Sequence, residues 1–328
     1  MATEFGGVSA AVLGSWPTPL EAAPQLGRAI GLSVGDLWVK RDDLTGLGGG
    51  GNKVRKLEWL CGAALARGAD TLVTCGARQS NHARLTAAAG ARLGLRVVLV
   101  LAGSARDPGD GNVALDGLLG ASVVWAGDVA HEALDPLASD VLDQLRQKGA
   151  RPELIPYGGS SVLGACGYVV CGRELLHQAP DVATVVTALG SGGTMAGLVR
   201  ALGAGRVLGV DCGAIEQPAE AVATLVGGLA GAAPDPSALR LRLDHVGAGY
   251  AVLTEPVLAA LTLAARTEGL ILDPIYTGRA LAGLMSAVAE DEIKPGERTV
   301  LLHSGGLPGL FGHPGALARS VGALTEFS

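Results

Sequence analysis

Residues 48–58, GGGGNKVRKLE, place four glycines and an asparagine before two of the five lysines in the chain, Lys53 and Lys56. Asn52 is a favourable N-cap, so the stretch predicts a helix that begins at Lys53 and carries Lys56 one turn later on the same face. The positive end of the helix dipole should lower the pKa of Lys53 below its ordinary ~10.4, which suits an amine that attacks a carbonyl. Taken alone, the stretch is equally well interpreted as two exposed lysines beside Glu58.

Outward from this stretch, apolar strand-like runs alternate with helix-like segments along almost the whole chain. The runs are rich in valine and leucine, as in parallel sheets that are covered by helices on both faces. The pattern therefore predicts an α/β protein whose ligands bind at the carboxyl ends of the strands. Strands are expected at 37–40, 71–75, 96–103, 122–127, 153–159, 184–194, 206–213 and 299–306, and the loops expected to carry chemistry follow residues 40, 75, 157, 189, 274 and 303.

The composition excludes several classes of protein. Of the 328 residues, 48 % are hydrophobic and 17 % are charged, which excludes a disordered chain. The net charge of −6 and the aromatic content of 3 % argue against nucleic acid or an anionic membrane as a partner. No apolar run is long enough to cross a membrane and no export signal is recognisable, so a cytoplasmic protein is expected. The five cysteines include no CxxC pair, so buried thiols and no bound metal are expected.

Several other loops carry polar residues, and each also has a simpler structural interpretation. GARQSNHARL (76–85) can cap a helix through Ser80 or Asn81 and offers a helix N-terminus to a carboxylate or phosphate. In ALGSGGTMAG (188–197), backbone N–H groups could hold a phosphate monoester, although an ordinary tight turn is the commoner outcome. Three further stretches indicate a functional site only weakly when each is taken alone: LDPIYTGRALAG (272–283) with Tyr276 and Thr277, GAGY (247–250) with Tyr250, and LLHSGGLPGLFG (301–312).

Together, these motifs resemble the D-cysteine desulfhydrase and 1-aminocyclopropane-1-carboxylate deaminase family over nearly the whole chain. The resemblance rests on KRDDLTGLGGGGNKVRKLE, GARQSNHAR, GNVALDGLLGA, SGGTMAG, LDPIYTGRALAGL and LLHSGGLPGLF, which occur in this order. It implies a pyridoxal-phosphate enzyme of the tryptophan-synthase-β type (fold type II), with two open, twisted, mainly parallel sheets flanked by helices. It also implies a large cofactor-binding domain, residues 1–56 and 167–328, and a small substrate-side domain, residues 57–166.

The same resemblance implies how the cofactor, pyridoxal 5'-phosphate, is held. Lys53 would form the Schiff base and Lys56 would support the phosphate, which explains the paired lysines. The glycines before them would let the backbone approach the cofactor closely, since they carry no Cβ. The other implied contacts are Asn52 at the helix start, Asn81 with the ring hydroxyl, the N–H groups of Gly190, Ser191, Gly192, Gly193 and Thr194 with the phosphate, and Thr277 with the pyridine nitrogen.

The resemblance also implies a set of substrate contacts. Ser80, Asn81 and His82 would receive the substrate carboxylate at a helix start, and Ser80 is a candidate proton shuttle. Tyr276 would lie near the substrate α-carbon as an acid/base or orienting group, and Tyr250 would contact the substrate as well. Lys53, Ser80 and Tyr276 are therefore the implied catalytic residues.

Two positions favour the desulfhydrase side of the family. Members that resemble the deaminase carry a glutamate after the tyrosine and a glutamine after Ser-Asn, where this chain has Thr277 and His82. A hydroxyl cannot keep the pyridine nitrogen protonated as a carboxylate can, and the weaker electron sink suits β-elimination, in which the leaving group takes the charge. The chain departs from the desulfhydrase pattern in a glycine run lengthened by Gly48 and Gly49. It also departs at Arg78, which could bind a second carboxylate or a phosphate.

The function that these residues imply is α,β-elimination on a small β-substituted amino acid, with D-cysteine giving pyruvate, ammonia and hydrogen sulfide. The alternatives are 1-aminocyclopropane-1-carboxylate deamination, or a lyase for L-cysteine, 3-chloroalanine or 2,3-diaminopropionate. A nicotinamide oxidoreductase would need an early GxGxxG unit with an acidic residue after the next strand, and a non-catalytic relative would have lost motif residues; the sequence shows neither feature. Because family members are often homodimers, a homodimer with a small amino-acid substrate is expected.

Overall fold

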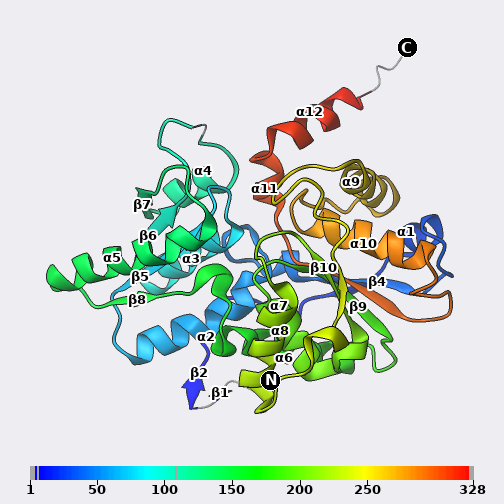
Figure 1. Ribbon diagram of the computed structural model, residues 1–328, viewed down its shortest axis with the longest axis horizontal. Coiled ribbons are helices and arrows are strands. Elements are labelled where there is room, and N and C mark those ends of the chain that lie inside the picture. The colour runs from blue at the N-terminus through cyan, green and yellow to red at the C-terminus, as the bar shows by residue number, and fades with distance from the viewer. Residues whose placement is uncertain (1–3, 6, 108, 325–328) are drawn as a thin grey trace.

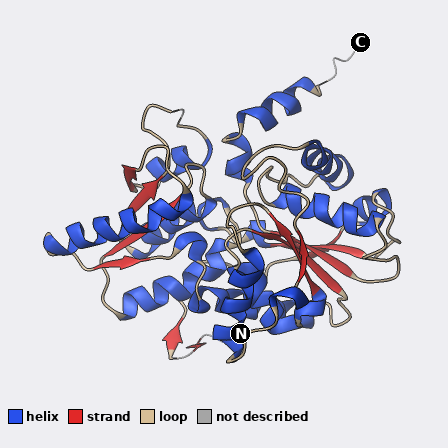
Figure 2. Ribbon diagram, in the orientation of Figure 1, coloured by secondary structure: helices blue, strands red, loops and turns tan. Residues whose placement is uncertain are grey.

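The computed structural model describes residues 4–5, 7–107 and 109–324 and places two sheets on opposite sides of the molecule (Figure 1 and Figure 2). In the larger sheet only the edge strand β3 (Leu20–Ala22) is antiparallel to its neighbour, β4 (Leu37–Arg41). This sheet has the order β11 (Arg240–Arg242), β10 (Val207–Asp211), β9 (Thr184–Leu189), β12 (Thr299–His303), β4, β3. The expected parallel α/β architecture is confirmed.

The smaller sheet is parallel throughout and has the order β7 (Ser122–Trp125), β6 (Arg96–Leu101), β5 (Thr71–Gly76), β8 (Pro152–Leu154). All four of its strands fall within residues 57–166. The strands of the larger sheet all lie outside that range. The division of the chain into two domains at these boundaries stays a prediction.

Helices cover the faces of both sheets, as expected for strands buried on both sides. A short antiparallel pair, β1 (Glu4–Phe5) and β2 (Val8–Ser9), precedes them. The helices are α1 (Pro24–Ala29), α2 (Lys53–Ala66), α3 (Asn81–Leu93), α4 (Gly111–Leu118), α5 (Leu134–Gln147), α6 (Val162–Gln178), α7 (Gly193–Leu202), α8 (Pro218–Ala230), α9 (Glu255–Glu268), α10 (Thr277–Ala289), α11 (Leu307–Phe311) and α12 (Pro314–Gly322).

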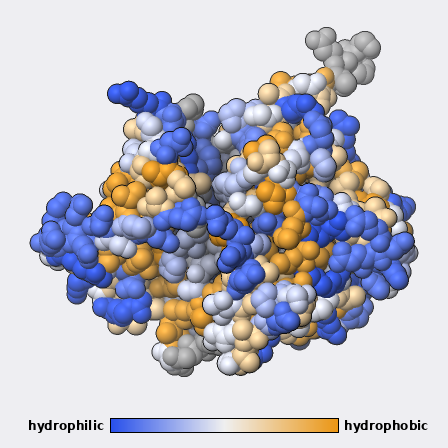
Figure 3. Space-filling view, viewed as in Figure 1, coloured by the Kyte–Doolittle hydropathy of each residue, from blue (hydrophilic) through white to orange (hydrophobic). Residues whose placement is uncertain are grey.

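The packing of α5 shows how burial follows from sequence spacing. Leu134, Ala138 and Leu142 recur at intervals of four and pack against Val73 and Val100 on one face of the smaller sheet. Burying each leucine contributes about 1.5–3 kcal/mol relative to leaving it in water. The opposite side of α5 is hydrophilic, and it forms the polar end at the left of the molecule in Figure 3. An apolar stripe on a polar helix thus holds α5 on the sheet.

A buried polar network fixes α2, the helix that begins at the paired lysines. The guanidinium of Arg55 binds Asp42 at 2.8 Å through two nitrogens and Glu174 at 3.0 Å. Lys40 pairs with Glu174, and the Tyr168 hydroxyl donates to Asp42 at 2.5 Å. Because each buried charge has a partner, the network is not penalised as an isolated charge would be. It fixes the rotation of α2 about its own axis.

The strand expected at 153–159 is shorter in the structure. β8 ends at Leu154, and residues 157–159 form a single 3₁₀ turn in which Gly158 and Gly159 have φ of +60° and +63°. Such φ values favour glycine and are incompatible with a strand that continues to residue 159. The turn lies beside the cavity described below.

The five cysteines are all buried and free, as expected. Among the helices of the described ranges, none is long and apolar enough to cross a membrane.

Candidate active site

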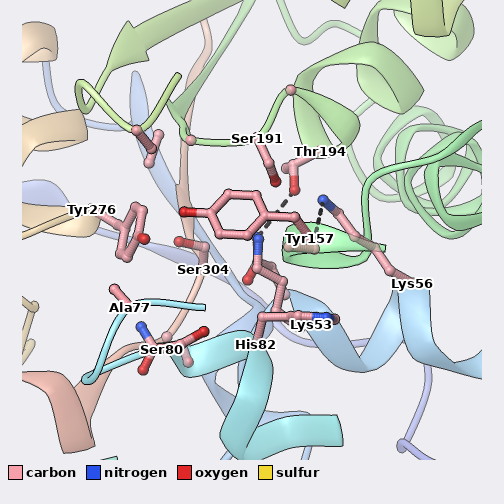
Figure 4. Close-up of a pocket in the computed structure, with 18 of the residues that line it drawn as sticks. Lys53, Lys56, Ala77, Ser80, His82, Tyr157, Ser191, Thr194, Tyr276 and Ser304 are labelled. Atoms are coloured by element: carbon pink, nitrogen blue, oxygen red, sulfur yellow. Dashed lines mark hydrogen bonds between the residues drawn. The ribbon is translucent and has the colours of Figure 1, made fainter. Parts of the chain in front are cut away.

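A cavity lies at the carboxyl ends of strands from both sheets, and all six loops expected from the sequence contribute to its wall (Figure 4). The wall also includes Ala214, from the loop after β10, which the sequence analysis did not single out. The residues that line it are Asn52, Lys53, Lys56, Ala77, Ser80, Asn81, His82, Tyr157, Gly158, Ala188, Gly190, Ser191, Gly192, Thr194, Met195, Ala214, Tyr250, Tyr276, Ser304 and Gly305.

Two amines and no carboxylate face this cavity along its described wall. Burial lowers the pKa of Lys53 to about 8, so the expected direction is confirmed, although the main cause is burial. Lys56 is 1 % exposed and donates to the Gly158 carbonyl at 3.2 Å and to Ser160 Oγ at 2.9 Å. Burial, followed by the charge of Lys53, holds the pKa of Lys56 well below its ordinary value. The alternative of two exposed lysines is therefore wrong.

Asn52 occupies the N-cap position of α2, but its side chain does not cap the helix as expected. Its Nδ2 donates instead to Thr194 Oγ1 at 3.0 Å, in the first turn of α7. Its backbone N–H donates to the Ser304 carbonyl at 2.9 Å. Asn52 therefore ties the start of α2 to α7 and to the end of β12, and this fixes where the Lys53 amine begins.

The loop between β9 and α7 forms a glycine-lined cradle. A Cβ at Gly158 would lie 2.1 Å from Ser191 Oγ, and a Cβ at Gly193 would lie 2.7 Å from Ser160 Oγ. Glycine is thus required for this close approach. The helix α7 starts here, and the first N–H groups of a helix have no intrahelical acceptor, so they can bind an anion.

The start of α3 is built as the sequence suggests. Ser80 Oγ accepts from the Ala83 N–H at 3.1 Å and caps the helix. Asn81 Oδ1 accepts from Asn112 Nδ2 at 3.0 Å, which orients the Asn81 amide. His82 Nε2 lies 3.0 Å from Thr74 Oγ1. Burial and then the two lysines hold the pKa of His82 well below its ordinary value, so the imidazole is neutral.

Tyr250 and Tyr276 face each other across the cavity wall. Their hydroxyl oxygens are 2.7 Å apart, and their rings meet edge to face with centroids 6.3 Å apart. Burial raises the pKa of Tyr250 to about 12 and that of Tyr276 well above its ordinary value, so both hydroxyls stay protonated. Tyr157, which follows β8, joins the wall and was missed, although it stands where an expected loop begins.

Comparison with known proteins identifies the family. Residues 12–305 match the model of the pyridoxal-phosphate dependent enzymes. The chain belongs to this family. A Pyrococcus abyssi protein with the provisional name 1-aminocyclopropane-1-carboxylate (ACC) deaminase is 40 % identical over 315 residues, which cover 90 % of this chain and 91 % of the relative. The D-cysteine desulfhydrase of Serratia proteamaculans (strain 568) is 39 % identical over 323 residues, which cover 90 % and 94 %.

A crystal structure described as "the ACC deaminase homologue" matches with a TM-score of 0.87 and 35 % identity over 94 % of this chain and 95 % of that one. The resemblance stated from the sequence, the type II fold and the dependence on pyridoxal phosphate are thereby confirmed.

The cavity fits pyridoxal phosphate on chemical grounds. Lys53 and Lys56 are amines that no carboxylate on the described wall neutralises, and a dianionic phosphate would stabilise their charged forms. In the cradle at 190–194, the glycine backbone and the hydroxyls of Ser191 and Thr194 would contact the phosphate. When bound, the cofactor supplies an electron sink for a carbanion at the substrate α-carbon.

Thr277 is placed differently from what its assigned role would require. It is 1 % exposed and is not part of the described wall. Its hydroxyl donates to Asp273 Oδ1 and accepts from the Asp273 N–H, both at 2.7 Å. The same carboxylate accepts from the Tyr276 N–H at 2.9 Å, so Thr277 stiffens the turn that carries Tyr276. Contact of Thr277 with the pyridine nitrogen stays a prediction, and Ser304, on the wall, is a competing candidate that the sequence analysis did not name.

Arg78 also points elsewhere. Its guanidinium donates to the Ser104 carbonyl at 2.7 Å and to the Asp107 carbonyl at 2.8 Å, and it stacks 4.9 Å from the centre of the Trp125 ring. It is not part of the described cavity wall. The structure therefore gives Arg78 a role in holding the 104–107 loop and does not bring it to the substrate position.

An adjoining hollow shares Ala77, Tyr157, Ala214 and Tyr250 with the cavity, and its wall includes segments that follow β5 and β6 of the smaller sheet and β10 of the larger sheet. Its described wall carries two acidic residues, Glu132 and Glu216, and no basic one.

Proposed function

We propose that this enzyme catalyses α,β-elimination on a small β-substituted amino acid, with D-cysteine and water giving pyruvate, ammonia and hydrogen sulfide. The main observation is that the described cavity wall has no aspartate or glutamate that could keep the pyridine nitrogen protonated. A hydroxyl partner, Thr277 or Ser304, leaves a weaker electron sink, which suffices when a good leaving group departs. The alternative is ACC deamination, and L-cysteine, 3-chloroalanine and 2,3-diaminopropionate are further candidate substrates.

Lys53 is proposed to attach the cofactor and to move the proton at the substrate α-carbon. A pKa of about 8 leaves part of its amine neutral near neutral pH, as a base and nucleophile must be. Lys56 is proposed to bind the phosphate, since it lies against the 190–194 cradle. The buried network around Arg55 supports both roles by fixing α2.

The start of α3 is proposed to receive the substrate carboxylate. Ser80, Asn81 and His82 lie on the wall at a helix N-terminus, where N–H groups and the helix dipole favour an anion. Because His82 is neutral and donates its one ring N–H to Thr74, whose own hydroxyl hydrogen goes to the Ile155 carbonyl, it would contribute its backbone N–H rather than a charge. Ser80 remains the candidate proton shuttle, and Asn81 the candidate contact of the ring hydroxyl.

The tyrosine pair is proposed to protonate the β-substituent as it leaves. Tyr276, hydrogen-bonded to Tyr250, keeps its proton at physiological pH and can donate it to a departing sulfur. The turn stiffened by Asp273 and Thr277 supports this role, because a proton donor must be held in place.

We further propose that residues 57–166 act as a small domain that closes over the substrate, and that the protein is a cytoplasmic homodimer. The position of the cavity between the two sheets supports the first proposal, because closure there would exclude water.

The test is 2-oxo acid formation from D-cysteine, L-cysteine, ACC, 3-chloroalanine and 2,3-diaminopropionate. D-cysteine is expected to have the highest kcat/KM, and Lys53→Ala is expected to abolish turnover. Lys148→Ala, at an exposed lysine, is the matched control that should leave turnover unchanged. A higher kcat/KM for ACC than for D-cysteine would reject the elimination and favour the alternative.

A further inference from the structure

One hydroxyl outside the described cavity wall, that of Ser160, joins three elements at the end of the cavity formed by the β9–α7 loop. Its Oγ lies 2.9 Å from Lys56 Nζ, 3.1 Å from the Gly193 backbone nitrogen and 2.8 Å from Ser191 Oγ. These partners belong to α2, the start of α7 and the loop before α7. Lys56 and Ser191 line the cavity, so Ser160 stands directly behind two of its polar groups.

The hydrogens available at Ser160 determine the direction of each bond. With a phosphate dianion bound, Lys56 is charged, so Lys56 Nζ and the Gly193 N–H can only donate, and they occupy the two lone pairs of Ser160 Oγ. The single hydroxyl hydrogen of Ser160 is left for Ser191 Oγ, which accepts it. Ser191 therefore keeps its own hydrogen for a group in the cavity.

Lys56 is constrained in the same way. Beside a bound phosphate dianion, which stabilises its charged form, Lys56 is an ammonium group with three hydrogens, and two of them go to the Gly158 carbonyl and to Ser160 Oγ. The third is left for the cavity, whose wall Lys56 joins. Two directed donors, one from Lys56 and one from Ser191, thus face the same region.

Gly193 makes this arrangement possible. A Cβ at this position would lie 2.7 Å from Ser160 Oγ and 3.0 Å from Lys56 Nζ, closer than atoms of a packed core approach. The Gly193 N–H, which the sequence analysis assigned to the phosphate, donates to Ser160 instead. The side chains that Ser160 orients, Lys56 and Ser191, would therefore supply more of the hydrogen bonds to the phosphate.

We propose that Ser160 is a positioning residue for the cofactor phosphate, because its hydroxyl orients Lys56 and Ser191 so that each directs one hydrogen at the phosphate. The inference rests on the cofactor and not on which amino acid is converted. Ser160 acts through its two partners, and its loss should weaken recognition of the phosphate and leave recognition of the pyridine ring unchanged.

The test is the binding of pyridoxal phosphate and of pyridoxal, which lacks the phosphate, to full-length Ser160→Ala, followed by visible absorbance without any amino acid. A lost hydrogen bond to a charged group costs about 1.5 kcal/mol, so the Kd for pyridoxal phosphate should rise about tenfold. The Kd for pyridoxal should stay within about twofold, since no phosphate contact is involved. An unchanged Kd for pyridoxal phosphate, or equal weakening of both ligands, would overturn the proposal.

Two further variants separate positioning from a general structural effect. Ser161→Ala removes the cap of α6 one residue away, where Ser161 Oγ accepts from the Gly164 N–H at 3.1 Å, and it should not change the preference for the phosphorylated ligand. The same selective loss in Ser161→Ala would contradict the proposal. Ser160→Ala combined with Ser191→Ala should cost less than the sum of the single changes, whereas strict additivity would show that Ser160 does not act through Ser191.

Discussion

Replacing Lys53 by methionine should stabilise the cofactor-free protein while removing its function. A pKa of about 8 against an ordinary 10.5 means that the buried ammonium costs about 3 kcal/mol at pH 7. The Lys53 side chain keeps some exposure to the cavity, so water there screens part of this cost, and about 1.5 kcal/mol is the expected gain. Methionine has a similar length and no charge, so it relieves this cost without leaving a large void.

The sign of the pH dependence gives this prediction its control. Lys53 binds its proton less tightly in the folded protein, where its pKa is about 8, than in the unfolded chain, where its pKa is 10.5. The stability of the unsubstituted protein therefore rises as the pH increases between these two values. The advantage of Lys53→Met should therefore shrink to about 0.6 kcal/mol at pH 9.5. Urea unfolding of both cofactor-free proteins at pH 7 and 9.5 measures this, and Lys148→Met, at an exposed site, should change stability little at either pH. A Lys53→Met protein that is less stable at pH 7 would refute the reasoning.

Three other outcomes follow from the site. The rate at which Lys53 binds pyridoxal phosphate should fall about tenfold for each pH unit below pH 8 and be constant above pH 9, because only the neutral amine attacks. A stopped-flow rate that is the same across this pH range would contradict this prediction. Arg78→Ala should leave KM within about twofold and lower the thermal midpoint, since Arg78 holds a loop and not the substrate, and steady-state kinetics that show a large rise in KM would contradict this. Tyr250→Phe should lower kcat about tenfold with unchanged cofactor absorbance, because Tyr276 loses its hydroxyl partner. An unchanged kcat would show that the hydrogen bond between the two tyrosines does not contribute to catalysis.

The sheets and the six loops of the cavity could be predicted from the sequence because both depend on local patterns. Continuous apolar strands indicate parallel sheets, and the carboxyl ends of such strands meet at one edge. The direction of the pKa change at Lys53 was also predictable, but its cause was not. Burial depends on chain segments such as the 157–159 turn, about which the helix start carries no information.

The contacts between distant segments could not be predicted. Arg55 and Glu174 are 119 positions apart, and Lys56 and Ser160 are 104 apart, so no local motif connects them. Asn52 was misjudged for the same reason, since a tertiary acceptor on α7 outcompetes the local cap. By contrast, the contact of Asp273 with Thr277 is local and could have been inferred from their spacing of four residues.

The central claim is that Lys53 carries the cofactor, and covalent trapping tests it most directly. The protein would be loaded with pyridoxal phosphate, reduced with borohydride, digested, and the modified peptide sequenced by mass spectrometry. The predicted result is a yellow protein with the label on Lys53 alone. A colourless protein, or a label on Lys56 or any other lysine, would contradict the account.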